Sequence, residues 1–446
     1  MPCLSFSLIE IKRKMLVEFR VKNFRSFKEE QVLSLVATKD NSLENNKIST
    51  SREDIPFLLR SAVIYGANAS GKSNLIKAIE CMQHLIKAPA IGEKPLFDIQ
   101  PFRLNKESIS SPITFEMTFI FDGVWYRYNF SFTGNLVSKE NGNFFKIEQI
   151  LNECLVVYQE TKTEVWFERD SDEYKFSIDE EKMNQLKGLI GRDTLFLSIA
   201  TQTCEAQNGD KRFLPISKWI NEQFFVVRSS FHPAYSINTL KTDSEQRQKI
   251  LDLMTSSDTG ITDIQVDTRK QPMHAVQINP QEHKAEFQIG FQEVNEPKFI
   301  HEYPNHYKEK FNISDESQGT IQLLGLAGPI GDILEKGRVL IIDEFDTHLH
   351  PLLARRLVKM FHDPEKNKNN AQLIFVTHNI SLLGKKLLDT DDLFRRDQIW
   401  FIEKDPQTQE SKLYPLSDFK HEDDDMRYLD NDYLLGCYGA IPCLSD

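Results

Sequence analysis

The chain has 446 residues, of which 66 are acidic and 54 are basic, so its formal net charge is −12. This balance argues against a surface built for non-specific binding of nucleic acid, although a local basic groove for DNA or RNA remains compatible with it. No apolar run reaches the roughly 18 to 20 residues that span a bilayer, and the six cysteines lack metal-binding spacing, so we expect a cytoplasmic protein without a membrane partner.

The N-terminal region contains two predicted strands. Residues 1–14 precede a second methionine, Met15, and are expected to be a leader that need not be ordered. Apolar and charged residues alternate from Leu16 to Val21, which predicts an edge strand with one solvated face. Further along, "LLRSAVIYG" is a continuous apolar run and predicts a strand buried on both faces that ends at Gly66.

The remaining elements follow in chain order. The stretch "SNLIKAIECMQHLIKA" has apolar residues at helical spacing and stops before Pro89, which predicts a helix. Residues 113–178 predict a meander of antiparallel strands with tight turns, and "DTLFLSIATQ" at 193–202 predicts another buried strand. A short helix is expected at 244–254. From Thr320 onward helices and strands alternate, which is typical of a parallel sheet covered by helices.

The stretch "GANASGKS" matches the phosphate-loop pattern G-x-x-x-x-G-K-[ST] and lies between a predicted strand and a predicted helix. In this motif backbone N–H groups surround a phosphate, Lys72 reaches the β and γ oxygens, and Ser73 ligates Mg²⁺. The nucleotide-binding residues predicted here are Gly66, Ala67, Asn68, Ala69, Ser70, Gly71, Lys72, Ser73 and Asn74.

Two later strands end in polar residues. The run "VLIIDEFD" places Asp343 and Glu344 directly after a buried strand, in the manner of a Walker B motif. Asp343 is expected to hold Mg²⁺, and Glu344 to orient or deprotonate the attacking water. In "FVTHN", His378 ends the next apolar strand, where an imidazole would sense the γ-phosphate. Carboxyl ends of parallel strands meet at one sheet edge, so these side chains are predicted to converge with the phosphate loop.

The segment "SDESQGTIQLL" predicts a second helix start that favours anions. Ser317, Gln318 and Gly319 precede an apolar helix, and small residues there expose its N-terminal amides. The segment resembles a divergent form of the signature motif of ABC-type ATPases, which contacts the γ-phosphate held by the opposite subunit. Gln318 stands where a glycine is usual in that motif.

The order of phosphate loop, antiparallel lobe, signature, "IIDEFD", "THLHP" and "THN" resembles the ABC-type ATPases of the SMC/RecF/OLD group over nearly everything after Met15. More closely, "VKNFRSFKEEQVLSLVA", "RRDQIWFIEKD", "LSDFK" and "YGAIP" are similar to the AAA-type ATPases of bacterial abortive-infection and restriction-linked systems, the AbiL/RloA type. The resemblance implies ATP and Mg²⁺ as cofactors. It also implies an α/β fold of P-loop NTPase type, with a parallel sheet core and an antiparallel β lobe.

We expect the leader to be followed by a first ATPase lobe at 15–205, a short mixed helical insertion at 206–300, and a second ATPase lobe at 301–446.

The resemblance assigns roles to four further residues. Gln202, at the end of the predicted strand 193–202, corresponds to a glutamine that touches Mg²⁺ and water. Asp346 and His348 fall where the D-loop crosses a dimer. Arg25, in "NFRSF", lies where such ATPases place a residue near the nucleotide, while an arginine on an edge strand is equally often only solvated.

The resemblance also implies a function: a nucleotide-sandwich homodimer, or a higher oligomer, that senses or regulates in anti-phage defence. Its partner would be a separately encoded effector of the nuclease or Toprim type. A fused Toprim nuclease is not expected, because only 68 residues follow His378 (446 − 378), and "HEDDDMRYLDND" fits a solvated acidic run. A RecF-like DNA-repair ATPase shares every nucleotide motif and remains the alternative. A transporter motor fits less well because of the tail motifs. A non-hydrolysing scaffold fits less well because Asp343 and Glu344 are both intact.

Overall fold

The computed structural model describes most of the chain in nine stretches: 14–92, 97–139, 142–159, 162–207, 209–228, 232–279, 284–384, 392–419 and 428–442. Residues 1–13 of the predicted leader and most of the acidic run at 421–432 lie outside them, whereas the last residue of the leader, Lys14, begins a strand. The chain divides into two units, and each is described by itself. The first comprises residues 1–229, 334–345 and 354–446, and the second comprises 230–333 and 346–353.

The first unit contains a six-stranded sheet in the order β11-β15-β16-β5-β17-β18. Its strands are β11 (Phe224–Val227), β15 (Val339–Ile342), β16 (Gln372–Val376), β5 (Ser61–Tyr65), β17 (Ile399–Lys404) and β18 (Ser411–Pro415). All neighbours are parallel except β17 and β18. Every residue of β5, β15 and β16 is buried, which explains why these strands are continuous apolar runs rather than alternating ones. The parallel core predicted from the sequence is confirmed.

The first unit also contains a seven-stranded antiparallel sheet in the order β10-β9-β8-β7-β6-β1-β2. Its strands are β1 (Lys14–Lys22), β2 (Gln31–Ser34), β6 (Ile113–Phe121), β7 (Val124–Lys139), β8 (Gly142–Tyr158), β9 (Thr163–Asp170) and β10 (Glu173–Phe176). The predicted meander is therefore correct. The prediction of an edge strand at Leu16–Val21 is wrong, because β1 lies between β2 and β6.

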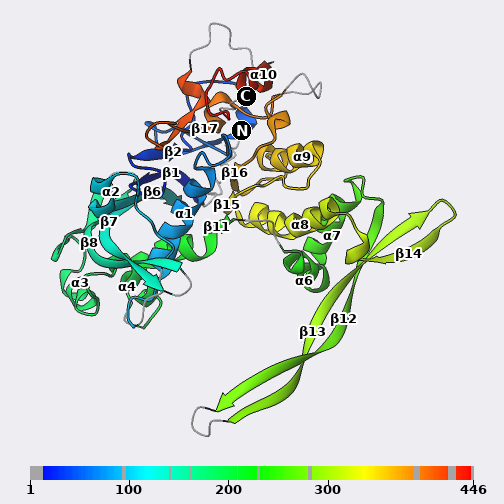
Figure 1. The fold of residues 1–446 in the computed structure, drawn as a ribbon, viewed down its shortest axis with the longest axis horizontal. Helices are drawn as coiled ribbons and strands as arrows, with labels where there is room; N and C mark the ends of the chain where they lie inside the picture. Colours follow the sequence, from blue (N-terminus) through cyan, green and yellow to red (C-terminus); the bar gives the residue numbers. More distant parts are fainter. Residues whose placement is uncertain are drawn as a thin grey trace, which may run out of the picture. The chain divides into compact units, whose positions relative to one another are not determined.

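A single hydrophobic core joins the two sheets. Helix α1 (Lys72–Lys87) contributes Leu75, Ile76 and Ile79 to it, together with Phe115 of the antiparallel sheet and Ile374 of the parallel sheet. Figure 1 shows α1 beside both sheets. Because the phosphate loop leads directly into α1, this core fixes the direction in which the loop points.

The predicted buried strand at 193–202 is wrong: these residues lead into helix α4 (Phe196–Thr203). A short apolar run does not distinguish a buried strand from a buried helix by periodicity. What selects the helix is tertiary. The carboxylate of Glu153, which is fully buried, accepts the backbone N–H groups of Phe196 (2.7 Å) and Leu197 (2.8 Å), which have no partner within the helix.

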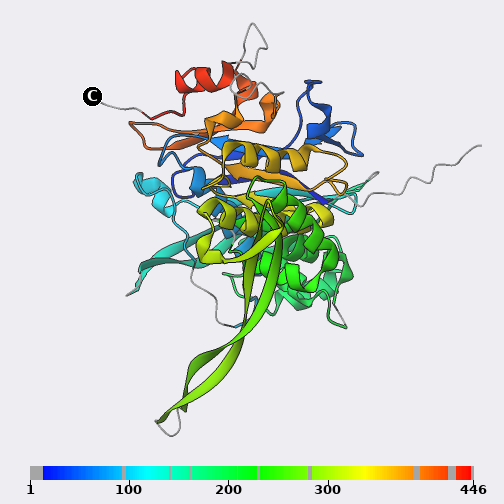
Figure 2. The same ribbon diagram turned by 90° about the vertical axis from the view of Figure 1, so that its right-hand side faces the viewer.

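The second unit combines two short helices and most of helix α8 (Gln318–Lys336) with a long hairpin. Helices α6 (Ala234–Thr242) and α7 (Ser244–Thr255) precede strands β12 (Ile261–Asn279), β13 (Lys284–Tyr303) and β14 (Tyr307–Asn312). In both views β12 and β13 extend away from α6 and α7 as an arm (Figures 1 and 2). The sequence predicted α7 but gave a mixed helical character to 206–300, so it missed this hairpin.

Within the described ranges, none of the helices combines the length and the hydropathy needed to traverse a bilayer.

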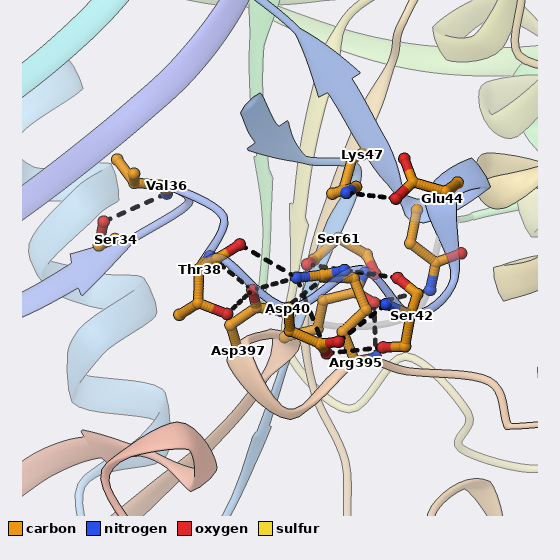
Figure 3. Close-up of polar contacts among 12 residues, drawn as sticks. Ser34, Val36, Thr38, Asp40, Ser42, Glu44, Lys47, Ser61, Arg395 and Asp397 are labelled. Carbon is orange, nitrogen blue, oxygen red and sulfur yellow. Dashed lines mark hydrogen bonds and ion pairs between the residues drawn. The ribbon is translucent and has the colours of Figure 1, made fainter. Parts of the chain in front are cut away.

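A buried ion pair ties the tail of the chain to its N-terminal region (Figure 3). Arg395 is inaccessible to solvent and binds Asp397 through Nε (2.9 Å) and Nη2 (2.8 Å). The Asp397 carboxylate also accepts the backbone N–H and the hydroxyl of Thr38, both at 2.8 Å. Gln398, which directly follows Asp397, donates to Ser61 Oγ at 2.8 Å, at the start of β5. The motif "RRDQ" therefore holds β17 against β5.

Asp397→Asn is expected to lower the free energy of unfolding by about 3–5 kcal/mol, because it removes the hydrogen-bonded countercharge of a buried guanidinium and leaves the more distant pair with Asp40 at 3.9 Å. Urea unfolding would measure this. The matched control is Asp54→Asn, which breaks a pair with Arg52 in which the aspartate side chain is 60% exposed, and should change the free energy of unfolding little. Equal effects of the two substitutions would contradict the structural role of Asp397.

Candidate nucleotide site

Three strand ends meet at one edge of the parallel sheet. The register pairs Ile342 of β15 with Phe375 of β16, and Val376 of β16 with Ile64 of β5. Chain direction is the same in all three strands, so the residues that follow them leave the sheet at a common edge. The phosphate loop, the pair Asp343 and Glu344, and His378 all follow these strands, as the sequence predicted.

The phosphate loop has the backbone that its glycines allow. Gly71 has φ of 116° and lies at the N-terminus of α1, and a Cβ there would lie 2.6 Å from Ser411 Oγ and 2.8 Å from Ser26 Oγ. At Gly66, a Cβ would lie 2.4 Å from the carbonyl oxygen of Ile402. Neither position therefore accepts a side chain. Ala69 also adopts a left-handed φ of 62°.

Lys72 is the first residue of α1 and is buried against the loop. Its Nζ donates to the carbonyl oxygens of Gly66 and Ala67, each at 2.8 Å. Burial lowers the pKa of Lys72 to about 8, and the negative charges of Asp343 and Glu344 oppose that shift. The side chains of the predicted phosphate loop and Walker B motif are thus close enough to interact electrostatically. Ser73 and Asn74 follow on the first turn of the helix, and Asn74 Nδ2 donates to Ser26 Oγ at 2.8 Å.

The pKa of Lys72 predicts that nucleotide affinity depends on pH. Below pH 8 the free protein already carries the ammonium group. Above pH 8 Lys72 is neutral in most molecules and must take up a proton before it can bind a phosphate. The apparent affinity for ATP should therefore fall by about tenfold per pH unit. Calorimetric titration of ATP in buffers of different ionisation enthalpy would measure the proton uptake. Lys72→Met should abolish this uptake, and a variant that keeps it would contradict the assignment.

Asp343 and Glu344 differ in their surroundings. The Asp343 N–H donates to the carbonyl of Val227 at 2.9 Å, and its side chain is buried, with no hydrogen-bond partner for Oδ1 in the part of the chain that the structure describes. A buried carboxylate oxygen without a partner is costly unless a ligand completes it. Glu344 is exposed and has a left-handed φ of 52°, a conformation that is uncommon outside glycine. The free oxygen of Asp343 fits a metal-binding role, and exposed Glu344 is accessible to water.

The donor set suits Mg²⁺. This ion takes oxygen ligands and is usually held by one or two carboxylates together with substrate phosphates rather than by a cage of protein side chains. Among the described residues no group of three or more His, Cys, Asp or Glu side chains comes together as a metal site. Asp343 and the hydroxyl of Ser73 are the groups at this edge that would hold the ion.

His378 is exposed at the end of β16, two residues after Val376. The preceding Thr377 is buried, and its N–H donates to the carbonyl of Ile64 at 3.2 Å, which continues the pairing of β16 with β5 beyond the strand. Asn379 caps the following turn by accepting the N–H of Ser381. These contacts place His378 at the same edge as the phosphate loop.

The structure does not bring Gln202 to this edge. Its amide donates to the carbonyl of Ala88 at 2.7 Å and accepts the N–H of Ala90 at 3.1 Å, just beyond the C-terminus of α1. Helix α1 has 16 residues and is therefore about 24 Å long, with the phosphate loop at its other end. The prediction that Gln202 ligates the metal is wrong, and the reason is the mistaken strand at 193–202.

Arg25 belongs to a tight turn after β1 rather than to a strand. Its φ is 54°, and its Nη2 forms a 2.6 Å ion pair with Asp98. Asn23, buried in the same turn, donates to the carbonyls of Ser108 and Ser111. The motif "NFRSF" is thus a structural turn that carries Ser26 to the phosphate loop. The guanidinium of Arg25 pairs with Asp98 through Nη2, whereas its buried Nε has no hydrogen-bond partner among the described residues.

The predicted signature and D-loop residues lie together in the second unit. Ser317 Oγ accepts the N–H of Thr320 at 3.1 Å, so Ser317 caps helix α8 (Gln318–Lys336). A Cβ at Gly319 would lie 2.9 Å from the carbonyl oxygen of His348, so only glycine allows this approach. Ser317, Gln318 and His348 are exposed, whereas Asp346 is half-buried.

Sequence reasoning missed two serines that contact the phosphate loop. Ser411 of β18 donates through Oγ to the carbonyl of Ser70 at 2.5 Å, and its N–H donates to the carbonyl of Ser26 at 2.8 Å. Lys28 and Glu410 form a 2.9 Å ion pair beside them. These residues come from the two ends of the chain, and no local pattern pairs them. The sequence signals that could have indicated this contact are the distinctive stretches "NFRSF" and "DQIWF".

Comparison with known proteins gives one family and a structural likeness. A family model described as "AAA domain, putative AbiEii toxin, Type IV TA system" matches residues 61–194 and 202–384. No curated protein sequence matches the chain.

Two solved structures match most of the chain, both at low identity and low TM-score. The SMC head domain from Thermotoga maritima is 13% identical, with a TM-score of 0.38, over 90% of this chain and 98% of that one. A structure of the SmcHead bound to the C-winged helix domain of ScpA is 14% identical, with a TM-score of 0.33, over 90% of this chain and 97% of that one.

Proposed function

Because the chain belongs to the family of AAA domains described as putative AbiEii toxin, Type IV TA system, we propose that it hydrolyses ATP with Mg²⁺ and uses the ATP-bound state to regulate a defence system. The family and the α/β P-loop fold predicted from the sequence are both confirmed. The observation that carries the enzymatic proposal is the common sheet edge, where buried Lys72 interacts with Asp343 and Glu344 and Asp343 keeps an unpaired buried oxygen.

Each residue has a defined task in this proposal. Lys72 leaves the carbonyls of Gly66 and Ala67 and binds the β and γ phosphate oxygens, while the amides of the loop and of α1 surround the phosphates. Mg²⁺, when bound, neutralises charge on the phosphates. Asp343 and Ser73 would hold the ion. Exposed Glu344 accepts a proton from the attacking water, and His378 donates toward the γ-phosphate.

The active form proposed is a head-to-tail homodimer. Ser317 caps α8, and the first amides of that helix point along its axis toward an exposed end, which favours an anion. In the dimer this end would meet the γ-phosphate bound by the other chain. ATP would then stabilise association, since a ligand that binds only the joined state shifts the equilibrium toward it. Loss of phosphate would release the dimer and report to a separately encoded effector in a cytoplasmic anti-phage system.

Phosphate release in a malachite-green assay tests the enzymatic part. We expect Mg²⁺-dependent turnover that is insensitive to double-stranded DNA, and loss of turnover in Asp343→Asn. Turnover that requires DNA would instead favour the DNA-repair alternative, and an Asp343→Asn variant with full activity would exclude the metal site. The defence role is tested by plating phage on cells that carry the gene with its neighbours: Lys72→Ala should remove protection.

A further inference from the structure

A pocket lies on the hairpin of β17 and β18, the strands that adjoin the phosphate loop. It has a volume of about 370 Å³ and is lined by Glu403, Tyr414, Asp418, Phe419, Tyr438 and Gly439. Residues from three separate tail segments, β17, the β18 turn and "YGAIP", meet there. The sequence resemblance singled out these tail motifs, yet the proposed ATPase chemistry uses none of them.

Three of the six residues that line this tail pocket are aromatic. The ring of Phe419 is 5.7 Å from that of Tyr414 at 52°, and 5.4 Å from that of Tyr438 at 83°. Tyr414 also donates to the carbonyl of Tyr438 at 2.8 Å, which fixes the two tyrosines relative to each other. The faces of such rings attract cations, and the attraction grows where water is excluded.

The ionised groups that line the pocket are both negative. Among the described residues, Glu403 accepts the Ala440 N–H at 3.3 Å, and it lies 3.4 Å from the Tyr414 hydroxyl, whose proton is closer to the Tyr438 carbonyl. Both Glu403 and Asp418 are exposed. Burial raises the pKa of Tyr438 to about 12, so its phenol is neutral. Two cations lie near the pocket and are not among its lining residues: Arg396, which donates to the carbonyls of Phe419 and Leu416, and Lys412, which stands opposite Glu403 in the register of β17 and β18.

We infer that the tail pocket binds a guanidinium group, supplied by an arginine side chain of a partner protein. Planar guanidinium stacks on aromatic faces and pairs with carboxylates, and it is less strongly hydrated than an ammonium group. The pocket volume is sufficient for one such side chain. That this partner is the effector rests on the proposed function, whereas the preference for a cation rests only on the pocket.

The position of the tail pocket links it to the phosphate loop. Its two strands are the ones that contact the loop at both ends: β17 through the carbonyl of Ile402 at Gly66, and β18 through Ser411 at Ser70. A partner arginine held at Glu403 therefore binds the hairpin that also supports the nucleotide site. This gives a short route by which partner binding and nucleotide binding affect each other.

The test uses two small probes, N-acetyl-arginine amide and its neutral isostere N-acetyl-citrulline amide, titrated into the full chain with ligand-observed NMR. We expect the arginine probe to bind about tenfold more tightly than the citrulline probe. Asp418→Asn and Phe419→Leu should each remove most of this difference. Glu173→Gln, which removes an exposed carboxylate on β10 of the other sheet, is the matched control and should not alter it.

Equal binding of the two probes, or a preference for arginine that survives both Asp418→Asn and Phe419→Leu, would overturn the inference. Asp418 is exposed, so its substitution leaves the fold intact even if Phe419→Leu does not. ATP binding separates the two proposals: Asp418→Asn should bind ATP normally, and Lys72→Met should bind the arginine probe normally. Failure of the probe experiment therefore leaves the ATPase proposal standing, and the reverse also holds.

Discussion

Glu344→Gln is expected to lower ATP turnover by about 10²- to 10⁴-fold while ATP binding persists. Glu344 is exposed at the edge where Asp343 and Lys72 also lie, and its backbone has a left-handed φ of 52°. Glutamine keeps the size of the side chain and its capacity for hydrogen bonds but cannot accept the proton of the attacking water. A variant that binds and does not hydrolyse should also accumulate as an ATP-bound dimer.

Phosphate release and light scattering coupled to gel filtration measure the two consequences. The control is Glu365→Gln, which changes an exposed carboxylate in the loop after helix α9 (Pro351–His362) and should behave as the parent protein. If Glu344→Gln turns over ATP at the parent rate, another group is the general base. If the variant is inactive but remains monomeric with ATP, the catalytic role of Glu344 is supported and the trapping of an ATP-bound dimer is contradicted.

Lys72→Met is expected to weaken ATP binding by about ten- to a hundredfold, because it removes charge-assisted hydrogen bonds to the phosphates. The change should not unfold the protein. Lys72 Nζ contacts two loop carbonyls, and methionine fills a similar apolar volume at the start of α1. Equilibrium titration with a fluorescent ATP analogue would measure the loss.

Lys77→Met is the matched control, since Lys77 lies one turn further along the same helix and is half-buried. Its affinity for the analogue should match the parent protein. Equal losses in the two variants would mean that the effect reflects overall charge rather than a contact with phosphate.

The nucleotide edge could be predicted from sequence because each of its parts is local. A phosphate loop needs glycines at fixed spacing, and a buried strand that ends in Asp343 and Glu344 has few alternative interpretations. Parallel strand order then places these residues at one edge without any knowledge of side-chain contacts. Burial of Lys72 and the unpaired oxygen of Asp343 agree with this reasoning.

What could not be predicted depends on distant partners. The run at 193–202 is helical because a buried carboxylate, Glu153, receives its first amides, and no periodicity reveals that contact. Misreading this run misplaced Gln202 by the length of α1. Ser26 and Ser411 support the phosphate loop from opposite ends of the chain. The arm of β12 and β13 was likewise missed. Its two strands pair at 18 residue positions, and this register cannot be read from the composition of the segment.

The claim that each ATP is shared between two chains is tested most directly by mixing two inactive variants, Lys72→Ala and Ser317→Arg. In a mixed dimer one site combines the intact Lys72 of one chain with the intact Ser317 of the other, and the second site lacks both. We predict that the equimolar mixture recovers about a quarter of parent turnover, because half of the dimers are mixed and each holds one working site. A mixture no more active than its separate components would contradict the shared site.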